Sequence, residues 1–134
     1  MANFEQYTII GHLGRDAEMR YTPQGEPVTS FSVAVSRNWK NEAGEWVGQT
    51  KWIKVSAWGQ LAERTAELNK GQNVLVIGRL NGDKDGNPRT WQDREGKTRA
   101  SFEMTAERVV LLDKREQGEA AGESAGEAGD DIPF

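Results

Sequence analysis

Two tryptophans and a lysine recur at alternate positions in one stretch of the chain, residues 50–58. In an extended strand, alternate side chains point to opposite faces. One face would carry Trp52, Lys54, Ser56 and Trp58, and the other Ile53, Val55 and Ala57. Indole rings stack on any nucleobase and lysine holds phosphates, so this stretch predicts a surface for single-stranded nucleic acid. The alternative is that another subunit or a loop covers these tryptophans.

Arg37, Trp39 and Lys40 lie at the end of a second alternating stretch, residues 28–39, and we assign them to the same binding surface. Alternation places Trp39 with the apolar core positions of that stretch. Trp39 would therefore meet a ligand only if a bulge or barrel curvature at 36–38 intervened. Without either, it would cap the core.

Two further tryptophans lie in segments that we expect to be loops. Trp46 falls in a polar loop expected at 41–48, where it either clamps a ligand or packs under the loop, and both alternatives stay open. Trp91 and Arg94 lie in a hairpin-like excursion, residues 89–97, in which basic residues surround an aromatic ring. Such a composition suits a groove that follows a phosphate backbone. We assign both residues to the binding surface, with an exposed loop of solvated charges as the alternative.

The residue types do not predict catalysis or a metal site. The chain has no cysteine, a single histidine, His12, and no glycine-rich phosphate loop. Residues 83–87 begin like a calcium loop, but Pro88 replaces the required glycine and Arg94 the final glutamate, so we predict a turn. We expect a non-enzymatic protein without metal or cofactor. A metal-dependent nuclease that uses carboxylates is kept as a rival.

The remaining pattern predicts strands with one helix. The expected strands cover residues 7–21, with a bend at Gly11 and Gly14, then 28–39, 50–58, 74–80 and 99–112. A helical stripe at 60–70, ended by Gly71, lies between the third and fourth strands. This element order is typical of an all-β OB-fold, a five-stranded barrel. The strand at 74–80 is apolar on both faces, which predicts a central strand or one that a partner covers.

Charge divides the chain into parts. Residues 1–112 carry 15 basic and 14 acidic residues, whereas residues 113–134 carry 2 and 7, so the net charge of −4 hides a nearly neutral body. We predict a single-strand-binding domain at 1–112, a disordered Gly/Glu/Ala linker at 113–129 and an acidic protein-interaction tip at 130–134. The tip, which we expect to dock in a basic pocket of another protein unless it is simply a frayed end, consists of Asp130, Asp131, Ile132, Pro133 and Phe134. No stretch approaches the ~20 apolar residues of a membrane span, and we expect a cytoplasmic chain.

Motifs along nearly the whole chain resemble the bacterial single-stranded DNA-binding protein family. They are IIGHLGRD at 9–16, RYTPQG at 20–25, FSVAV at 31–35, TKWIKV at 50–55, WGQLAE at 58–63, KG at 70–71, VIGRL at 76–80 and DDIPF at 130–134. The resemblance implies an OB-fold, assembled as a homotetramer, that binds single-stranded DNA during replication, recombination and repair in the bacterial nucleoid. It implies that stacking aromatics fall on Trp39, Trp52, Trp58 and Trp91.

The resemblance also implies that the tip recruits replication, recombination and repair enzymes, and that it competes weakly with DNA. Two alternatives stay open beside it. One is an OB-fold assembly adaptor that binds only protein, and the other is a single-strand binder that prefers RNA.

Overall fold

The structure is a computed structural model that describes residues 2–113, so the predicted linker beyond Asp113 and the tip lie outside the described residues. Its elements, in chain order, are β1 (Tyr7–Leu13), β2 (Glu18–Tyr21), β3 (Pro27–Lys40), β4 (Trp46–Trp58), α1 (Gln60–Thr65), β5 (Asn73–Leu80), β6 (Thr90–Gln92), β7 (Thr98–Ala100) and β8 (Phe102–Leu111). No helix within this part of the chain is long and apolar enough to span a bilayer.

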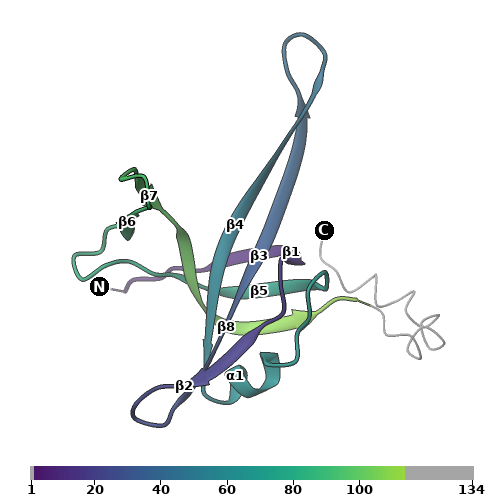
Figure 1. Cartoon of the computed structure of the whole chain (residues 1–134). Coiled ribbons are helices and arrows are strands. Elements are labelled where there is room, and N and C mark those ends of the chain that lie inside the picture. The colour runs from purple at the N-terminus through teal and green to yellow at the C-terminus, as the bar shows by residue number, and fades with distance from the viewer. Residues whose placement is uncertain (1, 114–134) are drawn as a thin grey trace, which may run out of the picture.

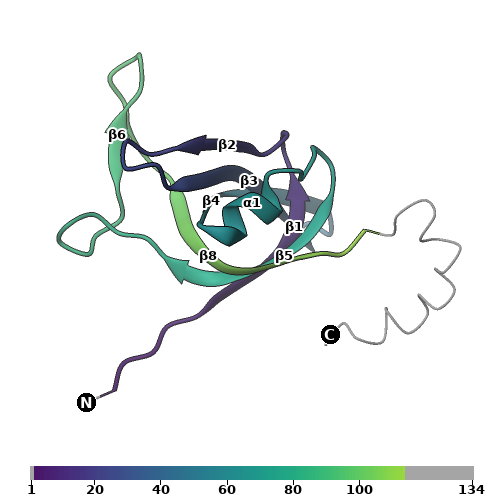
Figure 2. The ribbon, with the colours of Figure 1, turned by 90° about the horizontal axis from the view of Figure 1, so that it is seen from below.

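Five of these strands close into a barrel. The sheet order is β1-β5-β8-β4-β3-β2, and an additional pairing of β1 with β3 closes the ring. Viewed along its axis, the ring encloses the core, and α1 lies across its lower end (Figure 2). The helix follows β4 and precedes β5, the third and fourth barrel strands. The predicted OB-fold is therefore confirmed.

The inward positions of the barrel strands fill its interior. β4 contributes Ile53, Val55 and Ala57, all fully buried, which confirms the predicted alternation. β5 lies between β1 and β8, so the predicted central position of this strand is also confirmed. Its inward side chains are buried, whereas Leu75 and Ile77 on the outer side are only half-buried.

The helix is shorter than predicted, because it ends at Thr65 and not near residue 70. The Thr65 hydroxyl donates to the Leu61 carbonyl at 2.9 Å, and a turn follows in which Leu68 N–H donates to the Thr65 carbonyl at 3.1 Å. The Leu68 carbonyl then accepts the N–H of Ala17 at 3.0 Å, a contact with the segment between β1 and β2. Tertiary contacts therefore replace the last helical turns.

β1 continues through Gly11 without interruption, and the backbone bends at Gly14 and Arg15, so the predicted bend is confirmed at Gly14 and not at Gly11. Gly11 lies where β1 passes between β3 and β5. A Cβ atom at this position would lie only 2.2 Å from the Ala34 carbonyl oxygen. The absence of a side chain thus allows the close strand approach that closes the barrel.

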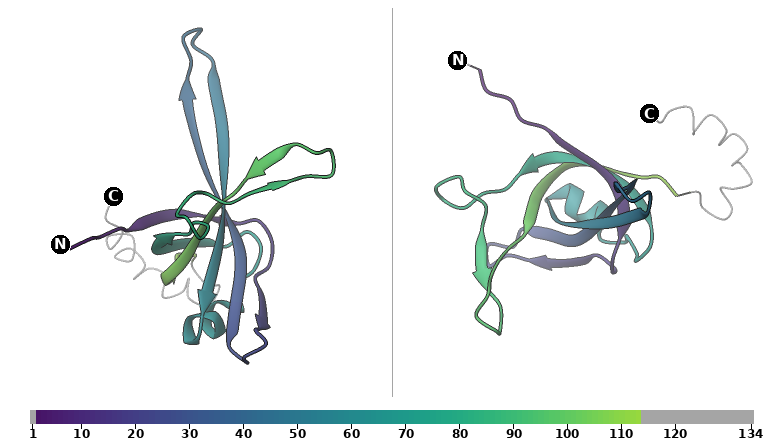
Figure 3. Two further views of the ribbon diagram at one scale, coloured as in Figure 1. Left: turned by 90° about the vertical axis from the view of Figure 1, so that its left-hand side faces the viewer. Right: turned by 90° about the horizontal axis from the view of Figure 1, so that it is seen from above.

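A long two-stranded arm, residues 35–51, projects from the barrel end opposite α1 (Figures 1 and 3). The polar loop predicted at 41–48 is wrong, because β3 continues to Lys40 and β4 already begins at Trp46. The antiparallel register runs without a shift from Val28 opposite Trp58 to Lys40 opposite Trp46. Only residues 41–45 turn.

That turn is one of four of the same type among residues 2–113, each with glycine in fourth place. The segments are 22–26, 41–45, 83–87 and 93–97, which begin with Thr22, Asn41, Asp83 and Asp93. In each, the first residue's N–H donates to the carbonyl of the fifth residue, and its carbonyl accepts the N–H of the fourth. Its side-chain oxygen also accepts the N–H of the fifth residue. Each glycine has φ between 81° and 88°, which a three-residue hairpin loop requires. The turn predicted at Asp83 is confirmed.

Candidate nucleic-acid interface

The outer face of β4 exposes the aromatic and basic residues that alternation assigned to it. Trp52 and Trp58 are 53% and 44% exposed, and Lys54 between them is exposed. The predicted orientation is therefore confirmed. Among residues 2–113, neither a loop nor another element seals these two rings, so each exposes a surface on which a base could stack.

Trp46 extends this face to the tip of the arm. It is 70% exposed, so it does not pack under a loop. Because it shares the parity of Trp52 and Trp58, the three rings recur every six residues on one side of β4, about 20 Å apart along the strand. The ammonium of Lys40, its cross-strand partner, lies 5.5 Å from the Trp46 ring centroid. The equal spacing of the three tryptophans was visible in the sequence. Because a loop was expected at 41–48, Trp46 was not assigned to the same strand as Trp52 and Trp58.

Trp39 faces the opposite side of the arm. No bulge interrupts β3 at 36–38, so Trp39 keeps the parity of Phe31 and Val35, as strict alternation predicts. The alternative of a core cap is wrong, because the strand has already left the barrel and Trp39 is 37% exposed. The Arg37 guanidinium lies 5.3 Å from the Trp39 ring centroid on this second face.

A basic hollow of about 650 Å³ lies directly beside Trp52. Arg15, Lys51 and Lys54 line it, together with Ser32 and Ser101, and no acidic residue is among its lining residues. The Trp52 ring forms one wall by lying over Gly14, where a Cβ atom would come within 2.4 Å of the ring. The nearly neutral body therefore does contain a local excess of positive charge.

Two more hollows continue from the first toward Trp58. The second, about 470 Å³, shares Arg15, Ser32 and Lys54 with the first. The third, about 440 Å³, shares Ser56, Arg89 and Glu103 with the second and reaches Trp58. We call this continuous surface the groove. Sequence reasoning missed the contribution of Arg15, Arg20, Lys51 and Arg89, because they come from separate segments of the chain.

Two of the three acidic residues that line the groove, Asp16 and Glu103, have partners, and the third, Glu18, is exposed. Asp16 accepts the N–H of Lys70 at 2.8 Å. Glu103 accepts from Arg89 at 3.5 Å. These contacts offset part of the negative charge, and the basic residues near Trp52 have no acidic neighbour in their hollow. Among residues 2–113, no three Asp, Glu or His side chains gather closely enough to hold a metal ion.

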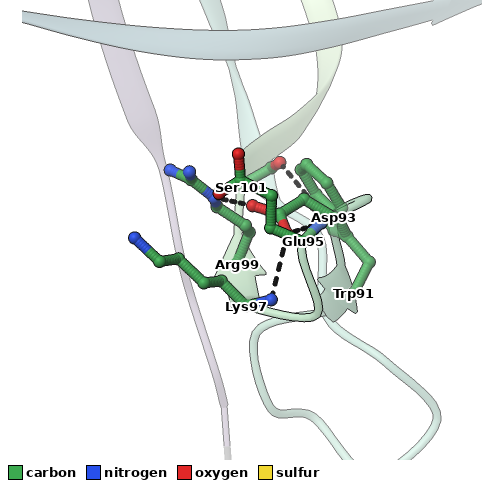
Figure 4. Close-up of polar contacts among 6 residues, drawn as sticks. All are labelled: Trp91, Asp93, Glu95, Lys97, Arg99 and Ser101. Carbon is green, nitrogen blue, oxygen red and sulfur yellow. Dashed lines mark hydrogen bonds and ion pairs between the residues drawn. The ribbon is translucent and has the colours of Figure 1, made fainter.

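The β6–β7 hairpin places Trp91 against the groove. Its indole N–H donates to the hydroxyl of Ser101, a residue that lines the basic hollow, at 3.2 Å (Figure 4). The predicted hairpin is confirmed, with Trp91 47% exposed. Arg94 is exposed in the turn, away from this hydrogen bond.

Asp93 holds the turn of this hairpin together. Its carboxylate accepts the side-chain N–H of Arg99 at 2.8 Å and the backbone N–H groups of Lys97 and Glu95 at 3.0 and 2.9 Å (Figure 4). The hydrogen bond from Arg99, followed by those from the backbone, lowers the pKa of Asp93 below its usual value of 3.8. The ionised carboxylate is thus the form that the hairpin favours.

Residues 4–112 match the family model described as the single-strand binding protein family. The chain is 36% identical over 104 residues to the single-stranded DNA-binding protein of Deinococcus radiodurans. This alignment covers 78% of this chain and 33% of the relative. It is 33% identical over 135 residues to single-stranded DNA-binding protein 1 of Xylella fastidiosa, and the alignment covers 99% of this chain and 93% of that relative. It is 36% identical over 110 residues to the single-stranded DNA-binding protein of Neisseria meningitidis, and the alignment covers 81% of this chain and 60% of that protein. The chain therefore spans a third of the Deinococcus relative but most of the Xylella one.

Solved structures agree on the fold. A deletion mutant of the single-stranded DNA binding protein from Thermus aquaticus matches with a TM-score of 0.65 and 28% identity, over 84% of this chain and 52% of the other. The Plasmodium falciparum SSB complex with ssDNA matches with a TM-score of 0.66 and 21% identity, over 84% of this chain and 98% of the other.

The contact of Trp52 with Gly14 predicts a selective effect of Gly14→Ala. The added methyl group collides with the ring, a movable side chain, so we expect the platform to tilt. Binding of an oligo-dT strand should weaken by about 1 kcal/mol, the lower end of the 1–3 kcal/mol that losing a whole stacking platform costs. The unfolding temperature should hardly change.

Gly11→Ala is the contrasting variant for this experiment. Its methyl group meets the backbone oxygen of Ala34, so we expect a loss of stability of about 1–3 kcal/mol. If Gly14→Ala lowers stability as much as Gly11→Ala does, the selective role of the Trp52–Gly14 contact is refuted.

The lowered pKa of Asp93 predicts that acid loosens the β6–β7 hairpin. A carboxyl group whose pKa is lower in the folded than in the unfolded protein stabilises the fold at pH values above its unfolded pKa, here 3.8. This stabilisation is lost as the pH falls through the pKa of the folded state. The Trp91 indole N–H resonance, followed from about pH 5 to about pH 2, should shift below pH 3.8. Asp93→Asn, which cannot ionise, should lack this transition. An identical titration in both proteins would contradict the assignment.

Proposed function

Because this chain belongs to the single-strand binding protein family, we propose that it binds single-stranded DNA with little sequence preference. One observation carries the proposal. The exposed ring of Trp52 stands beside a hollow lined by Arg15, Lys51 and Lys54 and by no acidic residue. A flat aromatic surface next to concentrated positive charge suits a strand whose bases are unpaired and whose backbone is anionic.

The aromatic residues would supply most of the base contacts. Trp58, Trp52 and Trp46 lie on one side of β4, with Lys54 and Lys40 close to them, so bases can stack in succession while cations hold the intervening phosphates. Trp91, tied to Ser101 at the edge of the hollow, would add a fourth ring. Because every base has a stacking face, this arrangement gives affinity without reading sequence.

Assembly into a homo-oligomer, which we propose to be a homotetramer, is supported by the outer face of the β1-β5-β8 sheet. Ile10, Leu75, Ile77 and Val110 are half-buried there and lie on neighbouring strands in register. Apolar side chains in one patch are more stable when another protein surface covers them. The partner that this face suits is a second copy of the chain.

The proposal extends to the processes in which the chain acts and to the enzymes that it recruits. We propose that the chain acts in replication, recombination and repair in the nucleoid, and that residues 130–134 recruit the enzymes of these processes. The tip lies outside the described residues, and its acidic and apolar composition supports the proposal. Comparing dT with rU oligomers in the titration below separates a DNA binder from one that prefers RNA, and an adaptor for protein alone would bind neither.

Removing the stacking rings singly is expected to weaken DNA binding. Trp52→Ala and Trp58→Ala should each cost about 1–3 kcal/mol of binding free energy to oligo-dT, the usual cost of one stacking platform. Trp46→Ala should lower affinity for long oligomers and not for those too short to reach the arm tip. Quenching of intrinsic tryptophan fluorescence measures all three. Unchanged emission of the unaltered chain at saturating oligo-dT would contradict single-strand binding.

Deleting residues 130–134 is expected to abolish binding of replication and repair enzymes. Because the acidic tip would compete weakly with DNA, affinity for oligo-dT should not fall and should rise slightly at low salt. The matched control carries the same five residues in scrambled order, which preserves the charge. Affinity capture with purified candidate enzymes measures the effect. Equal capture by the intact and truncated chains would show that recruitment does not depend on the tip.

A further inference from the structure

We propose that the third hollow of the groove, beside Trp58, is a pocket that selects one base of the bound strand, and that Glu103 makes the selection. The pocket favours cytosine and adenine, in which an amino group lies next to a ring nitrogen that accepts a hydrogen bond, over the keto bases thymine and guanine. The inference rests on the proposed function and goes beyond it, because stacking alone reads no sequence.

Glu103 is an enclosed carboxylate in the wall of this hollow. It precedes the buried Met104 on β8, so alternation points it to the outer face of the barrel, beside Lys54 of β4. Its side chain is only 15% exposed. Among residues 2–113 its carboxylate has one hydrogen-bond partner, Arg89, whose Nη1 lies 3.5 Å from Oε1.

That single contact leaves most of the acceptor capacity of Glu103 unused. Ordinary N–H···O hydrogen bonds are shorter, about 2.7–3.2 Å. A carboxylate has two oxygens with about four acceptor positions, and enclosing it is costly unless donors fill them. A ligand with an N–H donor would therefore be bound at this point of the groove.

The charge of Glu103 decides which part of a DNA strand can approach it. A phosphate is repelled, because two anions in an enclosed site repel each other strongly. The exposed guanidinium groups of Arg79 and Arg89 line the same hollow and can hold phosphates next to it. Trp58, also in the lining, offers a ring on which a base can stack. The group that meets Glu103 is therefore a base and not the backbone.

Asn81 places a hydrogen-bond donor next to this acceptor. Its backbone N–H donates to the Glu103 carbonyl at 2.9 Å, which holds the two residues side by side. Its side-chain oxygen accepts the Thr105 hydroxyl at 2.7 Å, so the amide oxygen is engaged and the NH₂ group remains as the donor. Asn81, Glu103 and Thr105 all line the hollow, whose volume is about 440 Å³.

An acceptor beside a donor matches the edge of two bases. Cytosine presents its N4 amino group next to the N3 acceptor, and adenine presents N6 next to N1. Glutamate accepting from the cytosine amino group is a recurrent contact in nucleic-acid recognition. Thymine and guanine carry a carbonyl oxygen in the place of the amino group, and that oxygen would face the carboxylate with no proton between them.

Oligo-dC and oligo-dT of equal length test the inference, because their bases have the same ring size and differ chiefly at this edge. Fluorescence quenching gives the dissociation constants of both for the unaltered chain and for Glu103→Gln. Glutamine keeps the shape of the side chain, but its amide donates to thymine as readily as it accepts from cytosine. We expect the affinity for oligo-dC relative to oligo-dT to fall about fivefold or more. An unchanged ratio would overturn the proposal.

Glu107→Gln is the matched control. Glu107 lies on the same strand, pairs with Arg79 at 3.4 Å and is not among the residues that line the groove. Its replacement removes one negative charge and releases one arginine, as Glu103→Gln does, so the relative affinity for the two oligomers should stay the same. An equal fall in both variants would show that charge and not a base contact sets the preference, and the pocket would be refuted.

A modified strand tests the pocket without altering the protein. Replacing the amino group of each cytosine by hydrogen removes the donor and keeps the ring. The unaltered chain should bind this oligomer about fivefold or more weakly than oligo-dC, and Glu103→Gln should distinguish the two less. Equal affinities for the unaltered chain would overturn the proposal.

The failure of this inference is distinguishable from failure of the proposed function. If the unaltered chain binds neither oligo-dC nor oligo-dT, single-strand binding itself fails. If it binds both and does not respond to the amino group, only the base-selective pocket fails.

Discussion

The structure depends on one uninterrupted antiparallel register, which joins β3 to β4 from the barrel to the tip of the arm. Because no residue is inserted, parity alone decides the face of every side chain along this length. Within the barrel, one parity fills the core and the other presents Trp52, Lys54 and Trp58. Beyond the barrel, both parities are exposed. A single extra residue in either strand would exchange the two sets and place tryptophans against the core.

A barrel of this size leaves no interior space for a ligand. Side chains such as Val33, Ile53 and Met104 fill it completely, and α1 lies across one end. Binding must therefore use the outside of the wall, where large rings are costly to leave in contact with water. A strand of DNA would cover those rings without any rearrangement of the core. Stability and binding thus depend on opposite faces of the same strands.

Charge acts locally in this molecule. The net charge of −4 suggests a poor partner for DNA. Yet acidic residues near the groove are engaged in specific contacts, as Glu103 is with Arg89 and Asp93 with Arg99. The hollow beside Trp52 retains three basic residues and no acidic one. Because salt screens charges beyond about 8–10 Å, this nearby set matters more to a bound phosphate than the total does.

The sequence by itself determined the face of each strand residue, the order of the barrel elements and the outward orientation of Trp52 and Trp58, because alternation and turn residues are local properties. It also contained the four turns that begin with Thr22, Asn41, Asp83 and Asp93. Only the tertiary structure decided where the core ends. Alternation states which way a side chain points and not what lies there, so it could not show that Trp39 would be exposed or that helix α1 would stop at Thr65. The groove likewise needed the fold. Arg15 follows β1, Lys54 is on β4 and Ser101 precedes β8, so the three residues meet only when these strands close into one ring.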